Sequence, residues 1–317
     1  MRANDNAIVT SRPPLPALCW GSAGVVAFSL TFPATRLALP AFGPVVTGLG
    51  RAVIAAVIAG LALLVARAPL PGRAQWRSIG LIALGGVVGF PLLTALALDH
   101  VGAGHAAVLV GLLPAATALA AVARAGERPQ LGFWLAAGAG LAAVLVFAAV
   151  RGAGRPQVAD LLLLGAVGAG ALAYAEGGAL ARTMPGWQVI AWALVVSAPL
   201  LVPVTAYTVL THPPRHLSVG AWLGLAYVAA VSAFLGFVAW YRGLARGGVA
   251  RIGQLQLAQP VLTLAWAALL LGERVDAVTV VAALAVLATT AATQRSRVRR
   301  QVADRNPPAV PVQVGAS

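Results

Sequence analysis

The chain has 317 residues, of which 60% are hydrophobic and 9% are charged, and its formal net charge is +14. So few charged side chains cannot cover a soluble core, and the composition excludes a water-soluble globular protein. The absence of lysine excludes a Walker A phosphate-binding loop and lysine-bound pyridoxal phosphate. Because the arginines lie between apolar runs and in the tails, we expect the positive charge to face anionic lipid and not nucleic acid.

Apolar runs of about 20 residues recur along the chain, without the alternating pattern of barrel strands. A backbone in lipid must satisfy its own hydrogen bonds, so these runs predict helices. Small residues four positions apart, as at Gly85/Gly89, Ala166/Gly170 and Gly220/Gly224, predict close packing of helix backbones. We therefore expect an all-α membrane protein with ten transmembrane helices, at residues 16–36, 44–66, 78–98, 103–123, 131–150, 160–181, 187–210, 219–241, 249–271 and 275–294.

The two halves of the chain carry one repeated pattern. Pro260 follows Pro114 by 146 residues, and each proline precedes a Gly-Glu-Arg tripeptide by the same distance. Aligning residues 98–130 on 244–276 at that offset gives nine identities. Five helices in each copy is an odd number of crossings, so the second copy must run in the opposite direction. A pair of inverted five-helix repeats with broken helices at equivalent positions is how many secondary transporters form a central substrate site.

The arginine distribution predicts the orientation. With the N-terminus in the cytoplasm, sixteen arginines fall in inside segments and five in outside segments, as the positive-inside rule requires. We expect a multi-pass protein of the cell (inner) membrane with both termini cytoplasmic. The expected parts are a cytoplasmic N-terminal segment at 1–15, the first repeat at 16–150, a linker at 151–158, the second repeat at 159–294, and a basic, disordered cytoplasmic tail at 295–317.

Several short motifs together resemble a known family. They are Trp20-Gly21-Ser22, Arg51 early in the second helix, Pro114 with Gly126-Glu127-Arg128, and Pro260 with Gly272-Glu273-Arg274. In this arrangement the chain resembles the ten-helix EamA-type permeases of the drug/metabolite transporter superfamily. The resemblance implies a secondary carrier that moves small metabolites, often outward, by alternating access. It does not identify the substrate.

Two charged residues lie deep within the expected helices, where a charge costs about 2.5–3.5 kcal/mol on insertion scales. Arg51 lies about 10 Å below the outer end of its helix; it either extends to the lipid headgroups or faces a cavity and attracts an anionic solute. Glu176 lies about 9 Å from the cytoplasmic end of its helix. It either forms a structural ion pair with Arg242 or acts as a proton-coupling or substrate-contacting carboxylate.

The ninth expected helix carries a polar stripe. Gln256, Gln259, Thr263 and Trp266 recur at steps of three to four, so they share one helical face with Pro260. This face is a candidate wall of a substrate cavity, with interhelical hydrogen bonding as the alternative. Tyr174 is a further candidate lining residue. The equivalent face of the fourth helix is almost wholly apolar, which favours an amphipathic solute.

The ends of the fourth and ninth helices carry acid–arginine pairs. We expect Glu127 with Arg128, and Glu273 with Arg274, to serve locally in capping, turn formation or salt bridging, with gating as the alternative. Pro114 and Pro260 are expected to break their helices, since proline removes a backbone donor. Four histidines on the predicted outer side have no metal-ligand spacing, so we expect loop histidines in solvent and no metal site.

The leading interpretation is a secondary carrier that exports small organic metabolites or drugs, and not an enzyme. No motif of an intramembrane protease or transferase is present in the sequence. A channel or a non-transporting membrane assembly protein is the second interpretation, and an intramembrane enzyme the third. No cofactor and no catalytic residue are implied. The expected partners are a small-molecule substrate, membrane lipid, and protons or another coupling ion.

Overall fold

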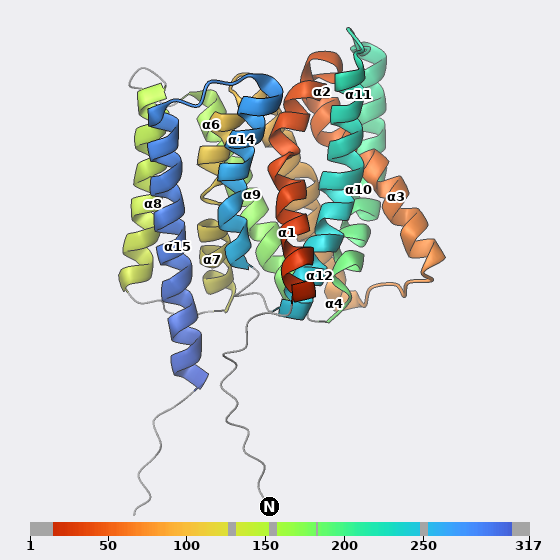
Figure 1. The fold of residues 1–317 in the computed structure, drawn as a ribbon. Helices are drawn as coiled ribbons and strands as arrows, with labels where there is room; N and C mark the ends of the chain where they lie inside the picture. Colours follow the sequence, from red (N-terminus) through yellow and green to blue (C-terminus); the bar gives the residue numbers. More distant parts are fainter. Residues whose placement is uncertain (1–14, 126–130, 152–156, 182, 248–252, 306–317) are drawn as a thin grey trace, which may run out of the picture.

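The computed structural model describes residues 15–125, 131–151, 157–181, 183–247 and 253–305. Glu127 and Arg128 lie outside these ranges. All regular secondary structure within them is helical (Figure 1); η1–η3 are π-helical and η4 is a 3₁₀ helix. The elements are α1 Leu15–Ser29, α2 Thr31–Val45, η1 Val46–Gly50, α3 Arg51–Val65, α4 Arg73–Ile82, η2 Ala83–Gly89, α5 Phe90–Leu98, α6 Ala103–Val110, α7 Leu113–Ala125, α8 Leu131–Arg151, α9 Val158–Leu180, α10 Gly186–Thr211, α11 Val219–Ala226, η3 Tyr227–Leu235, α12 Gly236–Gly247, η4 Gly253–Ala258, α14 Gln259–Leu271 and α15 Ala277–Arg305.

Seven helical segments of the described chain are long and apolar enough to cross a membrane, and two shorter apolar helices, Leu255–Leu271 and Ala277–Thr293, follow them. The first of the seven, Leu15–Val65, is not a straight rod. It turns at Gly43, whose φ of 68° lies in the left-handed region that glycine tolerates. Figure 1 shows α2 near the top of the molecule and α3 descending from it.

The C-terminal helix is longer than expected. α15 continues to Arg305, so residues 295–305 of the tail that we expected to be disordered are helical. Arginine is a good helix former, and five of the eleven residues at 295–305 are arginine. The expectation of disorder rested on the arginine cluster and on the proline- and valine-containing end of the tail, and it underestimated this propensity.

Element boundaries recur at the spacing of the sequence repeat. α4 begins at Arg73 and α11 at Val219, while α7 begins at Leu113 and α14 at Gln259, and both separations equal 146 residues. The π-helical stretches follow the same rule, because η3 covers every position equivalent to η2. The two halves therefore share several element boundaries and one π-helical stretch, whereas the positions equivalent to η1 lie within the regular helix α10.

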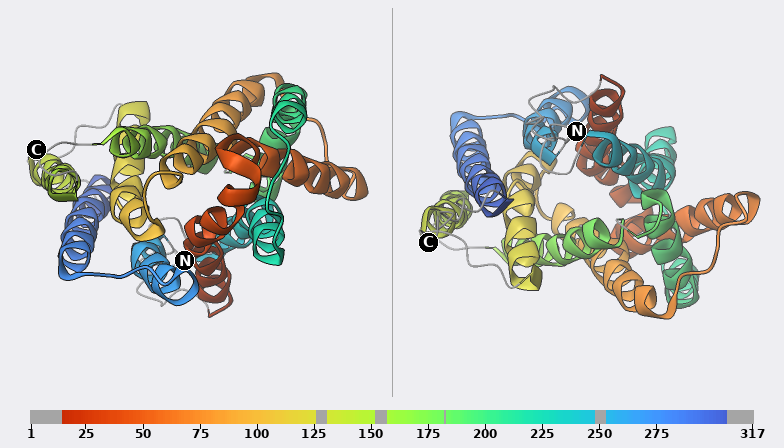
Figure 2. Two further views of the ribbon diagram at one scale, coloured as in Figure 1. Left: turned by 90° about the horizontal axis from the view of Figure 1, so that it is seen from above. Right: turned by 90° about the horizontal axis from the view of Figure 1, so that it is seen from below.

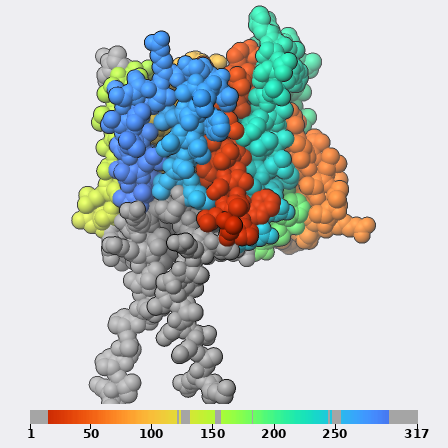
Figure 3. Space-filling model, viewed as in Figure 1, coloured from red at the N-terminus to blue at the C-terminus, as the bar shows by residue number. Residues whose placement is uncertain are grey.

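The helices are arranged around a central region, with α8 and α15 paired at one side and α3 beside α10 at the other (Figure 2). In the space-filling view, α15, α14, α1 and α11–α12 form one continuous face (Figure 3). Close packing depends on small residues. A Cβ added to Gly85 would lie 2.5 Å from the Ala169 carbonyl oxygen, and one added to Gly224 would lie 2.5 Å from that of Ala34. Close helix contact is thus confirmed at both positions.

We expect Gly85→Ala to lower the free energy of unfolding by about 1–3 kcal/mol, because the methyl group must displace the α9 backbone. The measurement is the thermal midpoint of the purified protein in detergent. Gly80→Ala is the matched control: the same change in the same helical segment meets no atom within 4 Å. It should leave the midpoint unchanged or raise it, since alanine favours helix. Equal midpoints for the two variants would contradict the packing argument.

Candidate functional site

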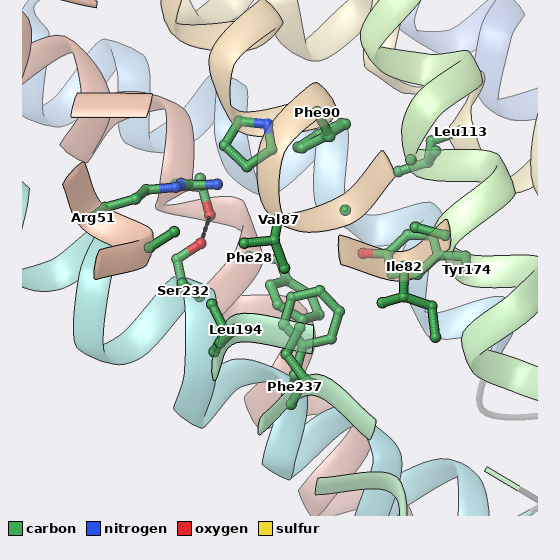
Figure 4. Close-up of a pocket in the computed structure, with 18 of the residues that line it drawn as sticks. Phe28, Arg51, Ile82, Val87, Phe90, Leu113, Tyr174, Leu194, Ser232 and Phe237 are labelled. Atoms are coloured by element: carbon green, nitrogen blue, oxygen red, sulfur yellow. Dashed lines mark hydrogen bonds between the residues drawn. The ribbon is translucent and has the colours of Figure 1, made fainter. Parts of the chain in front are cut away.

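A central cavity lies between the two halves of the chain (Figure 4). Its wall is mainly apolar and aromatic, and helices from both halves contribute to it. The lining residues are Phe28, Thr31, Phe32, Arg51, Ala52, Ile82, Gly86, Val87, Phe90, Pro91, Leu113, Gly170, Ala173, Tyr174, Ile190, Leu194, Ser232, Ala233, Phe237, Tyr241 and Gln259. A smaller cavity shares Phe32, Leu113 and Gln259 with it and adds Gln256, Pro114, Pro260 and Thr263 among others.

Arg51 begins α3, directly after the π-helical stretch η1. Its side chain lines the central cavity and the residue is 7% exposed. Within the described part of the chain, its Nε atom has no hydrogen-bond partner. Figure 4 shows the guanidinium group at the same end of the cavity as the hydroxyl of Ser232. Of the two sequence alternatives, the structure thus has the arginine in the cavity wall.

Aromatic rings form much of the remaining wall. The ring centroids of Phe28 and Phe237 are 4.9 Å apart, those of Tyr174 and Phe237 are 6.1 Å apart, and those of Phe237 and Tyr241 are 5.9 Å apart. The hydroxyl of Tyr174 interacts with the side chain of Gln256. This contact joins α9 to the segment that precedes α14, so Tyr174 in the wall of the central cavity meets Gln256 in the wall of the smaller one.

The polar stripe of the ninth predicted helix divides into two groups. Gln259 lines both cavities and Gln256 lines the smaller one. Thr263, which also lines the smaller cavity, donates to the backbone carbonyl of Ser29 at 2.9 Å. Trp266 Nε1 donates to Ser29 Oγ at 3.0 Å and does not contribute to either described lining. Trp266 thus joins α14 to α1, which is the interhelical alternative, and a cavity role for it stays a prediction.

The contact to Ser29 has a local cause. In a regular helix the carbonyl of residue 29 would accept from the N–H of residue 33, but that residue is Pro33, which has none. Thr263 supplies the missing donor. Sequence analysis did not use Pro33. A proline within an apolar helix indicates that the carbonyl four residues earlier lacks its usual N–H donor and needs another partner.

Glu176 is buried, at 7% exposure, and lies outside the described lining of both cavities. Arg242, its suggested partner, has its guanidinium over the ring of Trp20, 5.0 Å from the centroid, and is exposed. The structure thus gives Arg242 a contact other than the proposed ion pair.

Glu273 caps a helix of the other half of the chain. Its carboxylate accepts from the backbone N–H of Ala103 at 2.7 Å and of Gly104 at 2.9 Å, the first residues of α6. A Cβ on Gly102 would lie 2.8 Å from the carboxylate, so the contact requires glycine there. Arg274 is exposed. The carboxylate therefore takes the capping role, in favourable alignment with the α6 dipole.

Pro114 and Pro260 each occupy the second position of a helix. α6 ends at Val110 before α7 begins at Leu113, and η4 ends at Ala258 before α14 begins. Thr290 donates to the carbonyl of Gly111 between α6 and α7, at 3.3 Å. The irregular backbone is thus covered by protein.

Two side-chain contacts on the same side as the Glu273 cap were missed by sequence analysis. His105 Nε2 lies 2.6 Å from Asp160 Oδ1, so this histidine is not the solvated loop residue that we expected. Arg151 lies 2.5 Å from Asp276. The backbone N–H and hydroxyl of Thr279, together with Arg151, hold the pKa of Asp276 below its ordinary value, so this carboxylate is ionised at neutral pH. The two partners of each contact are distant in sequence, so no local sequence pattern could predict these contacts.

A helical multi-pass membrane protein with an amphipathic central cavity has the architecture of a membrane transporter. The chain belongs to the EamA-like transporter family, which matches residues 15–149 and again residues 157–293.

Relatives support this class. An uncharacterized transporter of Bacillus subtilis (strain 168), YdeK, is 45% identical over 277 residues, which are 87% of this chain and 96% of the relative. A probable terminal-alkyne amino-acid exporter of Streptantibioticus cattleyicolor is 29% identical over 245 residues, covering 75% of this chain and 80% of the exporter. One solved crystal structure aligns with a TM-score of 0.61 at 20% identity, covering 92% of this chain and 100% of that chain; at this identity it shows a shared fold alone.

We expect Glu273→Ala to lower the free energy of unfolding by about 1.5–3 kcal/mol, because two N–H groups of α6 lose a charged acceptor. Thermal unfolding in detergent measures the effect. Arg274→Ala, next in sequence but exposed, should change stability by no more than about 0.5 kcal/mol. If the arginine variant were as destabilised as the glutamate variant, the ion pair and not the cap would be the important contact.

Proposed function

We propose that the protein is a secondary transporter that exports small organic metabolites or drugs by alternating access through the central cavity. One observation carries the proposal: the cavity wall contains five pairs of positions separated by the repeat spacing. These pairs are Phe28/Tyr174, Gly86/Ser232, Val87/Ala233, Pro91/Phe237 and Leu113/Gln259. A cavity on the axis between two related halves can be exposed to either side by equivalent movements of the halves.

The arrangement of ten crossings in two inverted repeats is part of this proposal. Dividing Leu15–Val65 at Gly43 and adding the two shorter apolar helices yields the ten crossings expected from the sequence. α8 and α15 occupy equivalent places in the two halves. In Figure 1, α8 ends at the top of the molecule and α15 begins there, so the two helices run in opposite directions, which supports inverted repeats. The two family matches likewise support the division into repeats at 16–150 and 159–294.

The orientation that we propose puts the lower face of Figure 1 in the cytoplasm. The described chain ends, at the start of α1 and the end of α15, both lie there, and most of the arginines belong to segments of that side. The segments 1–15 and 295–317 would then be cytoplasmic and the linker at 151–158 external. The export direction is supported by the relative named as an amino-acid exporter.

Export and counterflow in proteoliposomes test the function. The purified protein should catalyse saturable efflux of members of a panel of amino acids, organic acids, nucleosides and hydrophobic cations. Solute on the opposite side should accelerate exchange, which a carrier does and a channel does not. Absence of both activities for every compound would overturn the proposal.

Gln259 and Trp266 provide a matched pair of variants. Gln259→Ala should raise KM about 2- to 12-fold, because one hydrogen bond to the solute is lost from the cavity wall. Trp266→Phe removes the donor to Ser29 outside the described cavity lining, so it should lower thermal stability and leave KM unchanged. A KM shift for Trp266→Phe with none for Gln259→Ala would contradict the division of the stripe.

Glu176 is our candidate for proton coupling, with other ions as alternative coupling partners. Its burial within α9, two residues after the cavity residue Tyr174, makes a change of its charge costly and able to affect the transport cycle. Glu176→Gln should abolish the pH dependence of efflux while counterflow continues. If the rate and its pH profile both stay as in the unaltered protein, Glu176 is not the coupling residue.

A further inference from the structure

The guanidinium group of Arg51 lies in the wall of a mainly apolar cavity, and the described lining offers it no carboxylate partner. The residue is 7% exposed, and its Nε lacks a partner among the described residues. No carboxylate occurs in the described lining of either cavity. A buried cation without a counter-charge is costly, and the cost is removed when a bound anion neutralises it.

The surroundings of Arg51 provide one further donor for an anion. Thr31 Oγ1 and Ser232 Oγ lie 2.7 Å apart, and the hydroxyl that accepts in this pair keeps its own O–H free to donate. Figure 4 shows this hydrogen bond at the same end of the cavity as the Arg51 guanidinium. A planar fork of N–H donors beside a hydroxyl suits the two oxygens of a carboxylate.

The rest of the cavity wall defines the body of the ligand. Away from Arg51, the wall is built from side chains such as Phe90, Tyr174, Phe237 and Ile82 (Figure 4). These groups favour an apolar or aromatic body. With one cation and no anion in the described lining, a ligand with net charge −1 is favoured over a zwitterion, whose ammonium group would be desolvated without a carboxylate partner.

We propose that the central cavity is a binding site for small organic monocarboxylates, with the carboxylate on Arg51 and an apolar body against the aromatic wall. This inference names the substrate class of the transporter proposed above. Only the claim that the bound monocarboxylate is transported rests on that proposed function. Binding itself can be measured without transport, so the two claims can fail separately.

The first test uses the unaltered full-length protein in lipid nanodiscs. Three probes share one phenylpropyl body and differ in charge: 3-phenylpropionate, the neutral 3-phenylpropanamide and zwitterionic phenylalanine. We expect 3-phenylpropionate to bind about 10- to 100-fold more tightly than the amide, measured by ligand-dependent thermal shift and titration calorimetry. Phenylalanine should bind more weakly than 3-phenylpropionate. Equal affinities of the acid and the amide, or a preference for phenylalanine, would overturn the proposal.

The second test changes the residue. Arg51→Gln should abolish the preference for the acid over the amide, while Arg51→Lys should keep part of it, because a point charge remains without the planar fork. Arg274→Gln, the same change at an exposed site, should keep the full preference. If Arg51→Gln does not fold, the probe comparison in the unaltered protein decides alone. A retained acid preference in a folded Arg51→Gln protein would overturn the assignment.

The combined outcomes separate the two claims. Binding of 3-phenylpropionate through Arg51 without efflux or counterflow of any solute would support the site and overturn the transport function. Transport of other solutes by a protein that does not distinguish the acid from the amide would overturn the site and support the transport function.

Discussion

Backbone hydrogen bonding inside a membrane is the constraint on which the structure depends. A lipid-exposed amide or carbonyl without a partner costs several kcal/mol, so irregular backbone is tolerated where protein covers it. Two of the described irregular points follow this rule: Thr263 donates to the carbonyl of Ser29 that Pro33 leaves without a donor, and Thr290 donates to the carbonyl of Gly111. At both points a protein side chain supplies the partner that lipid could not. The same constraint creates polar contacts between the halves of the chain.

Much of the fold could be predicted from local pattern. Run length and composition identify the helices, and the 146-residue spacing of Pro114 and Pro260 predicts where element boundaries recur. Arg51 could be recognised as a candidate because a charge so far from Pro44 must lie at membrane depth. These properties depend on the position of a residue along one helix, and they could be predicted because hydropathy and residue spacing report that position.

The partners across helices could not be predicted. A stripe at helical spacing shows that Gln259 and Trp266 share a side of their helix, but not that one meets the cavity and the other meets Ser29. Glu273 looks like half of a local ion pair with its neighbour, yet its carboxylate contacts N–H groups about 170 residues away. Such contacts depend on which helices become neighbours, and no single-helix pattern encodes that choice.

The equivalent cavity positions carry different side chains: Leu113 is matched by Gln259 and Phe28 by Tyr174. In an inverted pair with identical halves, the inward-open and outward-open shapes would be related by the internal axis and would have equal free energy. Each unlike pair removes that degeneracy by its own increment. In the alternating-access transporter proposed above, such unlike pairs would contribute to the preference for one side, and exchanging the two members of a pair would shift the populations of the two shapes while the amino-acid composition stays the same.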